Sequence, residues 1–125
     1  MLVIPQPDAA IAVRRVQEYV QNRFAEAITL ADLCVVSGLK VRRLQMAFRT
    51  VVDMTPMQYV RSERLRRARV LLRQAGCLSV TWAATQSGFW HMAQFTQDYR
   101  RMFGELPSET LRQSAARKVC ERRAA

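Results

Sequence analysis

Apolar residues recur along the chain every three or four positions, which is the spacing of an amphipathic α-helix. No stretch alternates apolar and polar positions as a half-buried β-strand does. Together with residues that favour helix starts and ends, the pattern predicts about seven helices, at residues 9–26, 30–36, 41–52, 56–74, 80–86, 91–103 and 107–114. The predicted fold class is all-α.

The ends of several predicted helices carry recognisable residues. Thr29 followed by Asp32 resembles a capping box, in which each side chain satisfies a backbone N–H of the other residue. Thr55 precedes Pro56, and proline is favoured at the first position of a helix. Residues 115–125 are polar and basic, so we expect them to fray.

The apolar stripes also predict which side chains are buried, because a helix packs its apolar side on the core. We expect a buried side in the helices at 9–26, 41–52 and 91–103. Their stripes are Ile11, Val16, Tyr19, Val20 and Phe24; Val41, Leu44, Phe48 and Val51; and Phe95, Tyr99, Met102 and Phe103.

Two parts of the chain resemble each other. Residues 30–39 match residues 80–89, since each is a short helical stretch followed by Ser, Gly and an apolar residue. Beyond them the match continues with one residue added to the second part. The paired positions are Leu44 and Phe95, Phe48 and Tyr99, Val52 and Phe103, Pro56 and Pro107, and Arg61 and Arg112. A short helix, a glycine turn and a second helix, present twice, form the outline of a tandem helix-turn-helix.

The repeat predicts a first helix-turn-helix subdomain at 9–54, a linker helix at 55–75, a second subdomain at 76–114 and a basic tail at 115–125. At 1.5 Å per residue the linker helix would span roughly 28 Å, which approaches the roughly 34 Å of one turn of B-DNA. We therefore expect two recognition helices in successive major grooves.

The charge of the chain favours a polyanionic partner. Lys and Arg number 20 against 10 Asp and Glu, which gives a formal net charge of +10, and 18 of the cations are Arg. Arg grips phosphate and guanine edges as a planar fork, whereas Lys is a point charge. Nucleic acid is the first expectation and an anionic membrane the second. A merely solvated basic surface is the remaining alternative.

In a helix-turn-helix the second helix keeps one face on the core and presents the other to the major groove. Arg is suited to guanine and Gln to adenine, while Met offers apolar contact, for instance to a thymine methyl. In the first copy the face opposite the apolar stripe carries Arg42, Gln45, Met46 and Arg49. In the second copy it carries Ala93, Gln94, Thr96, Gln97 and Arg100, with Trp90, His91 and Met92 near the turn. Either face could also be an ordinary solvated one.

Two sequence stretches carry a family resemblance. They are L-x-x-x-S-G-L-K-V-R-R-L-Q-M-A-F-R…T-P-M-Q-Y-V-R-S-E-R-L-R-R-A-R-V-L-L and the more specific G-F-W-H-M-A-Q-F-T-Q-D-Y-R-R-M-F-G-E-L-P-S-E-T-L-R. Over residues 11–112 the chain resembles the DNA-binding domain of AraC/XylS-type transcriptional regulators. The resemblance implies two helix-turn-helix subdomains that share a linker helix and bind asymmetric sites near promoters.

The resemblance extends the list of candidate DNA contacts. It adds Arg43 to the first set, and it supports Met92, Ala93, Gln94, Thr96 and Gln97 in the second. Lys40, at the start of the first recognition helix, is a further candidate on its charge. The chain departs from the family pattern at four of the relevant positions. Lys40 stands where the family has Ser or Thr, Asp53 stands where it has Gly, and Met46 and Gln97 stand where a basic side chain is common.

Enzymatic functions find little support in the sequence. His91 is the only histidine, so a histidine metal site or catalytic triad cannot form, and we expect His91 to be a cap or phosphate contact. The three cysteines, Cys34, Cys77 and Cys120, lack disulfide or metal spacing and suit the bacterial cytoplasm. We expect no enzyme activity, no metal and no cofactor. Residues 1–7 lack the features of a secretory signal, and no apolar run is long enough to span a membrane.

The predicted function is sequence-specific binding of double-stranded promoter DNA by a transcriptional regulator. Members of the family commonly carry an effector-binding or dimerisation domain that is absent from this chain. We therefore expect the DNA-binding part of a longer regulator, with RNA polymerase as a further candidate partner. The alternatives are a non-specific architectural protein, a cysteine-dependent DNA-repair methyltransferase module and a membrane-surface protein. Specific-to-random affinity, methylation of the protein and liposome binding distinguish them.

Overall fold

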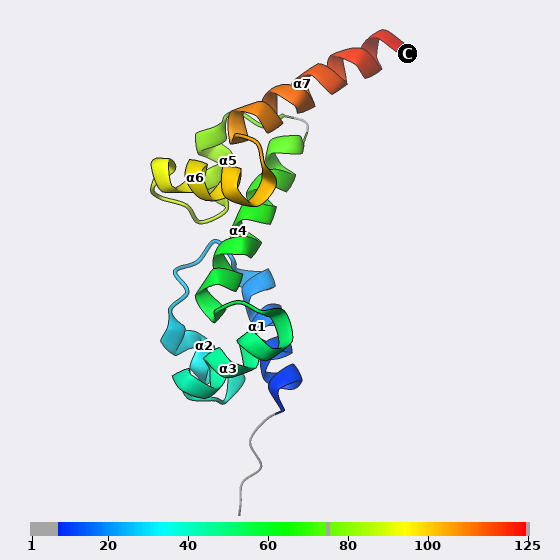
Figure 1. Cartoon of the computed structure of the whole chain (residues 1–125). Coiled ribbons are helices and arrows are strands. Elements are labelled where there is room, and N and C mark those ends of the chain that lie inside the picture. The colour runs from blue at the N-terminus through cyan, green and yellow to red at the C-terminus, as the bar shows by residue number, and fades with distance from the viewer. Residues whose placement is uncertain (1–7, 75, 125) are drawn as a thin grey trace, which may run out of the picture. The chain divides into compact units, whose positions relative to one another are not determined.

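The computed structural model describes residues 8–74 and 76–124, with side chains up to residue 116. All regular structure in this described part is helical, as the sequence predicts (Figure 1). The helices are α1 (Ala9–Arg23), α2 (Leu30–Ser37), α3 (Val41–Val52), α4 (Pro56–Arg73), α5 (Val80–Gln86), α6 (Met92–Phe103) and α7 (Pro107–Ala124). The all-α prediction is therefore confirmed.

The chain forms two compact units, Met1–Glu63 and Arg64–Ala125, and the division falls inside α4. Each unit has its own hydrophobic cluster. Because the clusters share no residue, each helix-turn-helix has a separate core to hold its second helix.

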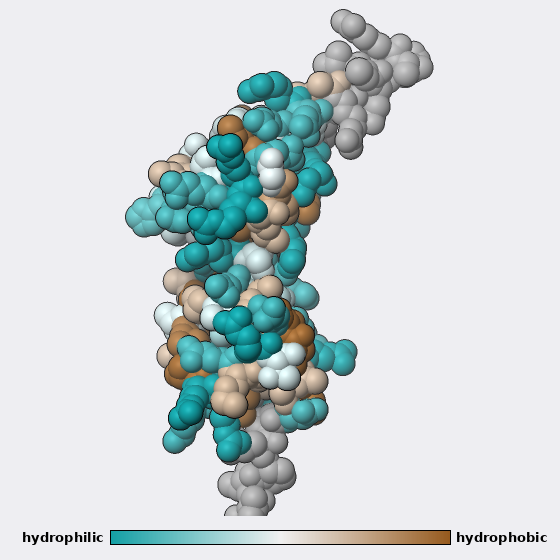
Figure 2. Space-filling view, viewed as in Figure 1, coloured by the Kyte–Doolittle hydropathy of each residue, from teal (hydrophilic) through white to brown (hydrophobic). Residues whose placement is uncertain are grey.

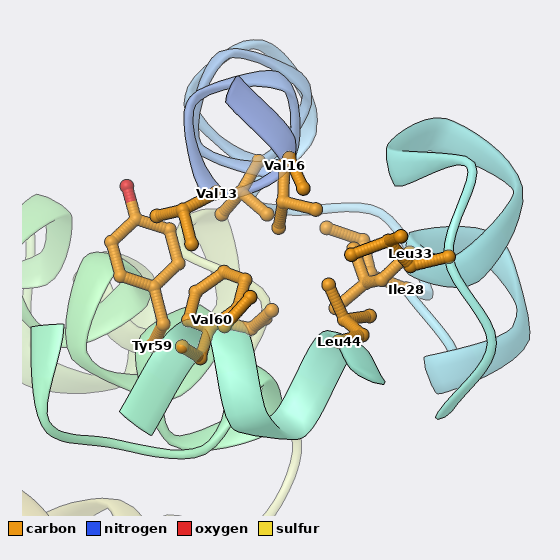
Figure 3. Packing of buried hydrophobic residues seen from close by; sticks show 12 residues of the cluster. Val13, Val16, Ile28, Leu33, Leu44, Tyr59 and Val60 are labelled. Carbon is orange, nitrogen blue, oxygen red and sulfur yellow. The ribbon is translucent and has the colours of Figure 1, made fainter. Parts of the chain in front are cut away.

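The core of the first unit lies between α1, α2, α3 and the start of α4. In Figure 3, Val13 and Val16 of α1 point toward side chains of the other helices, which include Leu33, Leu44 and Val60. The Phe48 ring lies 5.8 Å from the Tyr59 ring, centroid to centroid, in a tilted arrangement. This core is apolar, and it leaves only one face of α3 for solvent.

The core of the second unit is built around aromatic rings. Successive centroid distances are 4.8 Å from Phe89 to Phe95, 5.7 Å from Phe95 to Tyr99 and 4.7 Å from Tyr99 to Phe103. Leu65, Ala68 and Leu72 of α4 and the small Ala83 and Ala84 of α5 complete the cluster. These rings fix the buried side of α6.

The predicted caps are present at α2 and α4. The Thr29 backbone N–H donates to Asp32 Oδ2 over 2.9 Å, and the Asp32 N–H donates to Thr29 Oγ1 over 3.2 Å. The pKa of the Asp32 carboxyl is lowered, first by the hydrogen bond from the Thr29 backbone N–H and second by the Thr29 side chain. Thr55 and Gln58 exchange the same pair of bonds, over 2.9 and 3.1 Å.

Two predicted helix ends are wrong. The first helix stops at Arg23 and not at residue 26, because a turn closed by the Glu26 N–H and the Arg23 carbonyl redirects the chain. That turn lets Ile28 reach the core, where it is 7% exposed. The last helix runs to Ala124 and does not end near residue 114. Neither Gly nor Pro follows Pro107, and residues 115–118 are good helix formers.

The predicted buried stripes are shifted on two helices. Ile11, Val41 and Val51 are exposed at 50, 43 and 45%. Their expected places are taken by Ala12 and Ala47, which are 0 and 5% exposed. Small side chains let α1 and α3 approach closely, so the alanines lie in the contact and the β-branched residues remain at its edge. In α6 Met102 is likewise 36% exposed, while Phe95 and Tyr99 are fully buried as predicted.

Candidate nucleic-acid interface

The turn between α2 and α3 is fixed by a buried serine and a glycine. Gly38 adopts a left-handed conformation, φ 76° and ψ 12°, that glycine reaches without steric cost. The hydroxyl of Ser37 donates to the Cys34 carbonyl over 3.1 Å and accepts the Leu39 N–H over 3.2 Å. Leu39 is 6% exposed and anchors the chain at the start of α3. These contacts set the direction in which α3 leaves the turn.

α3 separates into a buried and an exposed face. Leu44, Ala47 and Phe48 are buried. All six candidates of the first copy are exposed: Lys40, Arg42, Arg43, Gln45, Met46 and Arg49. Arg42 and Arg43 form no hydrogen bond or ion pair with any residue that the structure describes. Their guanidinium groups can therefore meet an external anion without first breaking an internal contact.

Two features at the ends of α3 follow from the unusual residues there. Lys40 occupies the N-cap position, and its side chain makes no capping hydrogen bond, since an ammonium group has no acceptor. Asp53 ends the helix with φ 55° and ψ 40°. Its carboxylate lies 3.5 Å from Arg49 Nη1, but both side chains are largely exposed, so this pair stabilises the helix little.

A shallow concavity of about 510 Å³ lies beside the exposed face of α3. It is lined by the buried Leu39 and Ala47 and by Ala9 at the start of α1. Arg42, Arg43 and Met46 also line it, together with Thr50. Three candidate DNA contacts thus surround one partly apolar depression. The sequence does not predict this depression, because Ala9 is far from α3 in the chain.

The turn between α5 and α6 repeats the first with different partners. The Ser79 hydroxyl accepts the Trp82 N–H over 3.0 Å and so caps α5. The buried Ser87 hydroxyl donates to the Ala83 carbonyl over 2.8 Å, and Gly88 takes a φ of 94°. His91 stands at the N-cap position of α6, but its side chain makes no capping bond, so the expected capping role is wrong and the phosphate contact stays a prediction. Its ring is therefore available to an outside group.

α6 exposes a face dominated by amides. Ala93, Gln94, Gln97, Arg100 and His91 are exposed, while Met92 and Thr96 are half-buried. The Thr96 hydroxyl donates to the Met92 carbonyl over 2.8 Å, so its proton is already used within the helix. Gln94 Nε2 donates to Asp98 Oδ1 over 3.0 Å. Just before the helix, Trp90 is 76% exposed.

Sequence reasoning missed three charged residues of the second unit. Asp98 is 6% exposed, although it lies one turn after the exposed Gln94 on α6. Arg69 places its guanidinium carbon 4.5 Å from the centre of the Phe103 ring, and its Nη2 lies 3.6 Å from Glu105 Oε1. The spacing of Gln94 and Asp98, four residues apart in a helix, is a pattern that could have been noticed. The Arg69–Glu105 pair joins two elements and leaves no local pattern.

The surface of both units is mostly hydrophilic, as expected for a protein that binds an anionic partner, and it also exposes some apolar side chains. In the face shown in Figure 2, hydrophilic residues cover much of both units, and brown apolar residues interrupt them most visibly around α2 and α3. Met46, a candidate contact, is 62% exposed. Among the described residues no group of three or more His, Cys, Asp or Glu could hold a metal ion. No helix within the same residues is long and apolar enough to cross a membrane.

Comparison with known proteins identifies the family. Residues 33–113 match the family described as "Helix-turn-helix domain". The fold also matches that of a probable AraC family transcriptional regulator from Rhodopseudomonas palustris, with a TM-score of 0.77 and 38% identity over 82% of this chain and 96% of that one. The chain belongs to the AraC family. It contains the DNA-binding domain of an AraC-family transcriptional regulator, as the sequence motifs predict.

A curated relative and a second solved structure extend this result. The "XylDLEGF operon transcriptional activator 3" of Pseudomonas putida is 36% identical over 100 residues, which are 78% of this AraC-family chain. The chain spans about a third (30–32%) of the length of such curated relatives. The DNA-binding domain of AdpA, solved with a target DNA, shares the fold with a TM-score of 0.76 at 21% identity, covering 86% of this chain and 95% of that one.

Proposed function

We propose that this chain binds specific double-stranded DNA sequences as part of a transcriptional regulator, with α3 and α6 as its recognition helices. The observation that carries the proposal is the exposed face of α3. There Arg42, Arg43, Gln45 and Arg49 stand on the side opposite the buried Leu44 and Phe48. The helix is held by its turn and core, so this face is presented in a fixed orientation.

The chemistry of this face suits the major groove. A guanidinium group can donate two hydrogen bonds to N7 and O6 of guanine, and an amide can pair with N6 and N7 of adenine. Met46 supplies the apolar surface that a thymine methyl group prefers. Arg42, Arg43 and Met46 also line one depression, which brings two donor groups and one apolar group close together.

The second unit offers the same arrangement with fewer charges. Gln94, Gln97 and Arg100 are exposed on α6, and His91 stands at its start. We propose that Gln94 and Gln97 contact base edges while Arg100 and His91 contact phosphates. Because the candidates on α6 include one Arg where those on α3 include three, this helix would contribute less than α3 to salt-dependent affinity.

We further propose that the two recognition helices enter successive major grooves. The support is the length of the helix between them, since the 18 residues of α4 rise by about 27 Å at 1.5 Å per residue. One turn of B-DNA rises by about 34 Å. Short connecting turns at each end of α4 can supply the remainder.

The relatives suggest the context in which this domain works. The Pseudomonas putida relatives are named as activators of an operon, and the AdpA domain was crystallised with a target DNA. We propose that this chain likewise serves a bacterial transcriptional regulator that acts on chromosomal DNA in the cytoplasm and has no enzymatic step. An effector-binding domain and RNA polymerase are the further partners that membership of the AraC family predicts.

The test is a selection from randomised duplex DNA at physiological salt, with sequencing of the retained fraction. We expect a motif of two blocks about one helical turn apart. In Arg42→Ala or Gln45→Ala, one position of one block should lose its preference, at a cost of roughly 1–3 kcal/mol. The other block should remain unchanged.

Arg14→Ala is the matched control. Arg14 lies on α1, is 81% exposed and pairs only weakly with Glu18, so its loss removes one charge without touching α3. It should leave the motif unchanged. A single enriched block would limit base contacts to one unit. If no motif is enriched, the proposal fails and the alternative of a non-specific architectural DNA-binding protein is favoured.

A further inference from the structure

α6 contains one hydrogen bond that bears directly on base selection. Gln94 Nε2 donates to Asp98 Oδ1 over 3.0 Å, one turn further along the helix. We propose that Asp98 is a positioning residue, which holds the Gln94 amide so that it selects adenine and rejects guanine. This inference rests on the proposed function, because it requires α6 to lie in the major groove.

The orientation of the amide follows from the chemistry of its partner. An ionised carboxylate has acceptors and no donor, so the nitrogen of the Gln94 amide, and not its oxygen, must face Asp98. Asp98 is 6% exposed and is held within the packed side of α6, whereas Gln94 is exposed. A fixed, buried acceptor therefore holds a side chain that would otherwise rotate freely in solvent.

This bond changes which bases the amide can match. A free amide nitrogen has two hydrogens and could donate to the two acceptors of guanine, N7 and O6. With one hydrogen committed to Asp98, Gln94 presents one donor and the oxygen acceptor. Adenine offers the matching pair, an acceptor at N7 and a donor at N6. Guanine offers only acceptors, so its O6 would face the amide oxygen.

The first unit shows that this arrangement is not a requirement of the fold. In the repeat, Arg43 occupies the position of Gln94 and Ala47 that of Asp98. Arg43 forms no internal hydrogen bond within the described residues, and Ala47 is buried in the core. A guanidinium group presents only donors and suits guanine without help. Asp98 is therefore present in the unit that has Gln94. The amide of Gln94 has a donor and an acceptor end and must be oriented, whereas the guanidinium of Arg43 has donors only.

The experiment begins with the motif selected by the full chain. The base pair contacted by Gln94 is the position at which Gln94→Ala abolishes a preference for adenine, a loss of roughly 5- to 150-fold for a bidentate contact. Two duplexes that differ only by adenine or guanine at that position then compete for the same protein. In Asp98→Ala, we expect the adenine-to-guanine ratio to fall about 2- to 10-fold, because the released amide can turn and donate both hydrogens to N7 and O6 of guanine.

The design separates positioning from folding. The ratio compares two duplexes on one protein sample, so a partly unfolded variant gives the same ratio as a folded one. Asp98→Asn keeps the volume and one acceptor but adds a donor that permits the reversed amide, so it should keep only part of the preference, whereas Asp98→Leu has no acceptor and should keep none of what Asp98 adds. Gln97→Ala is the matched amide control, and it should leave the ratio at this position unchanged.

The outcomes distinguish the inference from the function on which it rests. If the unmodified chain enriches no motif, the proposed function fails. If a motif is enriched but Gln94→Ala changes no position, or if Asp98→Ala and Asp98→Leu keep the original ratio, the role of Asp98 is wrong while specific binding stands. A uniform loss of affinity for both duplexes in these variants would also overturn it.

Discussion

The two units place chemically different side chains at the same positions of the repeat. In the first unit Phe48 packs against the Tyr59 ring, with Met54 beside them in the cluster. Their counterparts in the second unit are Tyr99, Thr110 and Glu105, which form a chain of hydrogen bonds. The same backbone plan therefore accepts an apolar and a polar way of joining a recognition helix to the helix that follows it.

The direction of the polar chain can be assigned from its donors. Thr110 Oγ1 lies 2.9 Å from Glu105 Oε1, and because the carboxylate only accepts, the threonine hydroxyl donates to it. Tyr99 OH lies 2.7 Å from Thr110 Oγ1, so the phenol donates in turn. Gln113 Nε2 donates to the other carboxylate oxygen over 3.0 Å. Glu105 is thus the acceptor on which α6 and α7 converge.

The largest expected effect comes from giving the second unit the residue of the first, Glu105→Met. This change removes the acceptor of Thr110 and Gln113 and leaves the Arg69 charge without its partner. Arg69 Nε already lacks a hydrogen-bond partner among the described residues. The side chains of Arg69 and Glu105 are 28 and 17% exposed, so we expect a loss of about 2–3 kcal/mol, below the range for a fully buried pair.

Tryptophan fluorescence in a urea titration measures this change in the right unit, because both tryptophans, Trp82 and Trp90, lie in the second. Circular dichroism follows the whole chain. The control is the double variant Arg69→Met with Glu105→Met, which replaces the ion pair by apolar side chains and should regain more than half of the loss. A single variant as stable as the unmodified chain would show that the polar chain contributes nothing.

The difference between the two cores is only partly predictable from the sequence. Repeated Ser-Gly turns, the caps at Thr29 and Thr55 and the apolar spacing predict the helices and pair Phe48 with Tyr99. They do not reveal that the Tyr99 hydroxyl has a partner, because Thr110 and Glu105 belong to the next turn and helix. Local patterns predict helices, whereas contacts between helices depend on how those helices pack.

The same distinction between local patterns and contacts between elements applies to the candidate interface. The exposed residues of α3 follow from helical periodicity once Leu44 and Phe48 are placed in the core. Ile11 and Val51 were predicted to be buried but are exposed. Hydropathy alone favours them over alanine, although the small side chains of Ala12 and Ala47 occupy the core between the helices. The role of Asp98 depends on its hydrogen bond with Gln94. Helical periodicity cannot predict that bond, because it shows only that a polar residue falls on the buried side of α6.

Tyr99→Phe has the next largest expected effect. It removes the hydroxyl group of Tyr99, so that the second core has Phe where the first core has Phe48. It removes the phenol that donates to Thr110, and we expect a loss of about 1 kcal/mol, the usual net value of a buried hydrogen bond. Fluorescence-detected urea unfolding at neutral pH measures it. The reverse change, Phe48→Tyr, should not stabilise the first unit, because Tyr59 occupies the position of Thr110 there and the polar chain of the second unit is not reproduced.

The same variant has a signature in its pH dependence. Burial raises the pKa of the Tyr99 phenol above its usual value. A tyrosine in the unfolded chain ionises near pH 10, so between that value and the higher folded pKa the native state holds the extra proton. Stability is therefore complete below about pH 10 and falls as the pH rises further. Tyr99→Phe should flatten this fall, and an unchanged slope would contradict the assignment.

The smallest expected effect concerns the residue that ends each recognition helix. Asp53 and Gly104 are counterparts in the repeat, and both take left-handed conformations, with φ of 55° and 74°. Asp53 is the only non-glycine residue with a positive φ in the described chain. A side chain there is strained, whereas at Gly104 an added Cβ would meet no atom within 4 Å, so any cost would come from the backbone alone.

Exchanging the two residues isolates that backbone term. Asp53→Gly should stabilise the first unit by about 0.5–1 kcal/mol, less whatever the exposed Arg49–Asp53 pair contributes, and Gly104→Asp should destabilise the second by a similar amount. The first change should appear in circular dichroism without a shift of the tryptophan transition, and the second should shift both. If Asp53→Gly destabilised the chain, the contact with Arg49 would outweigh the strain, and the aspartate would be a stabilising helix end in its own right. Equal and opposite shifts would instead show that the two helix ends differ only in the conformational cost of a side chain at a left-handed position.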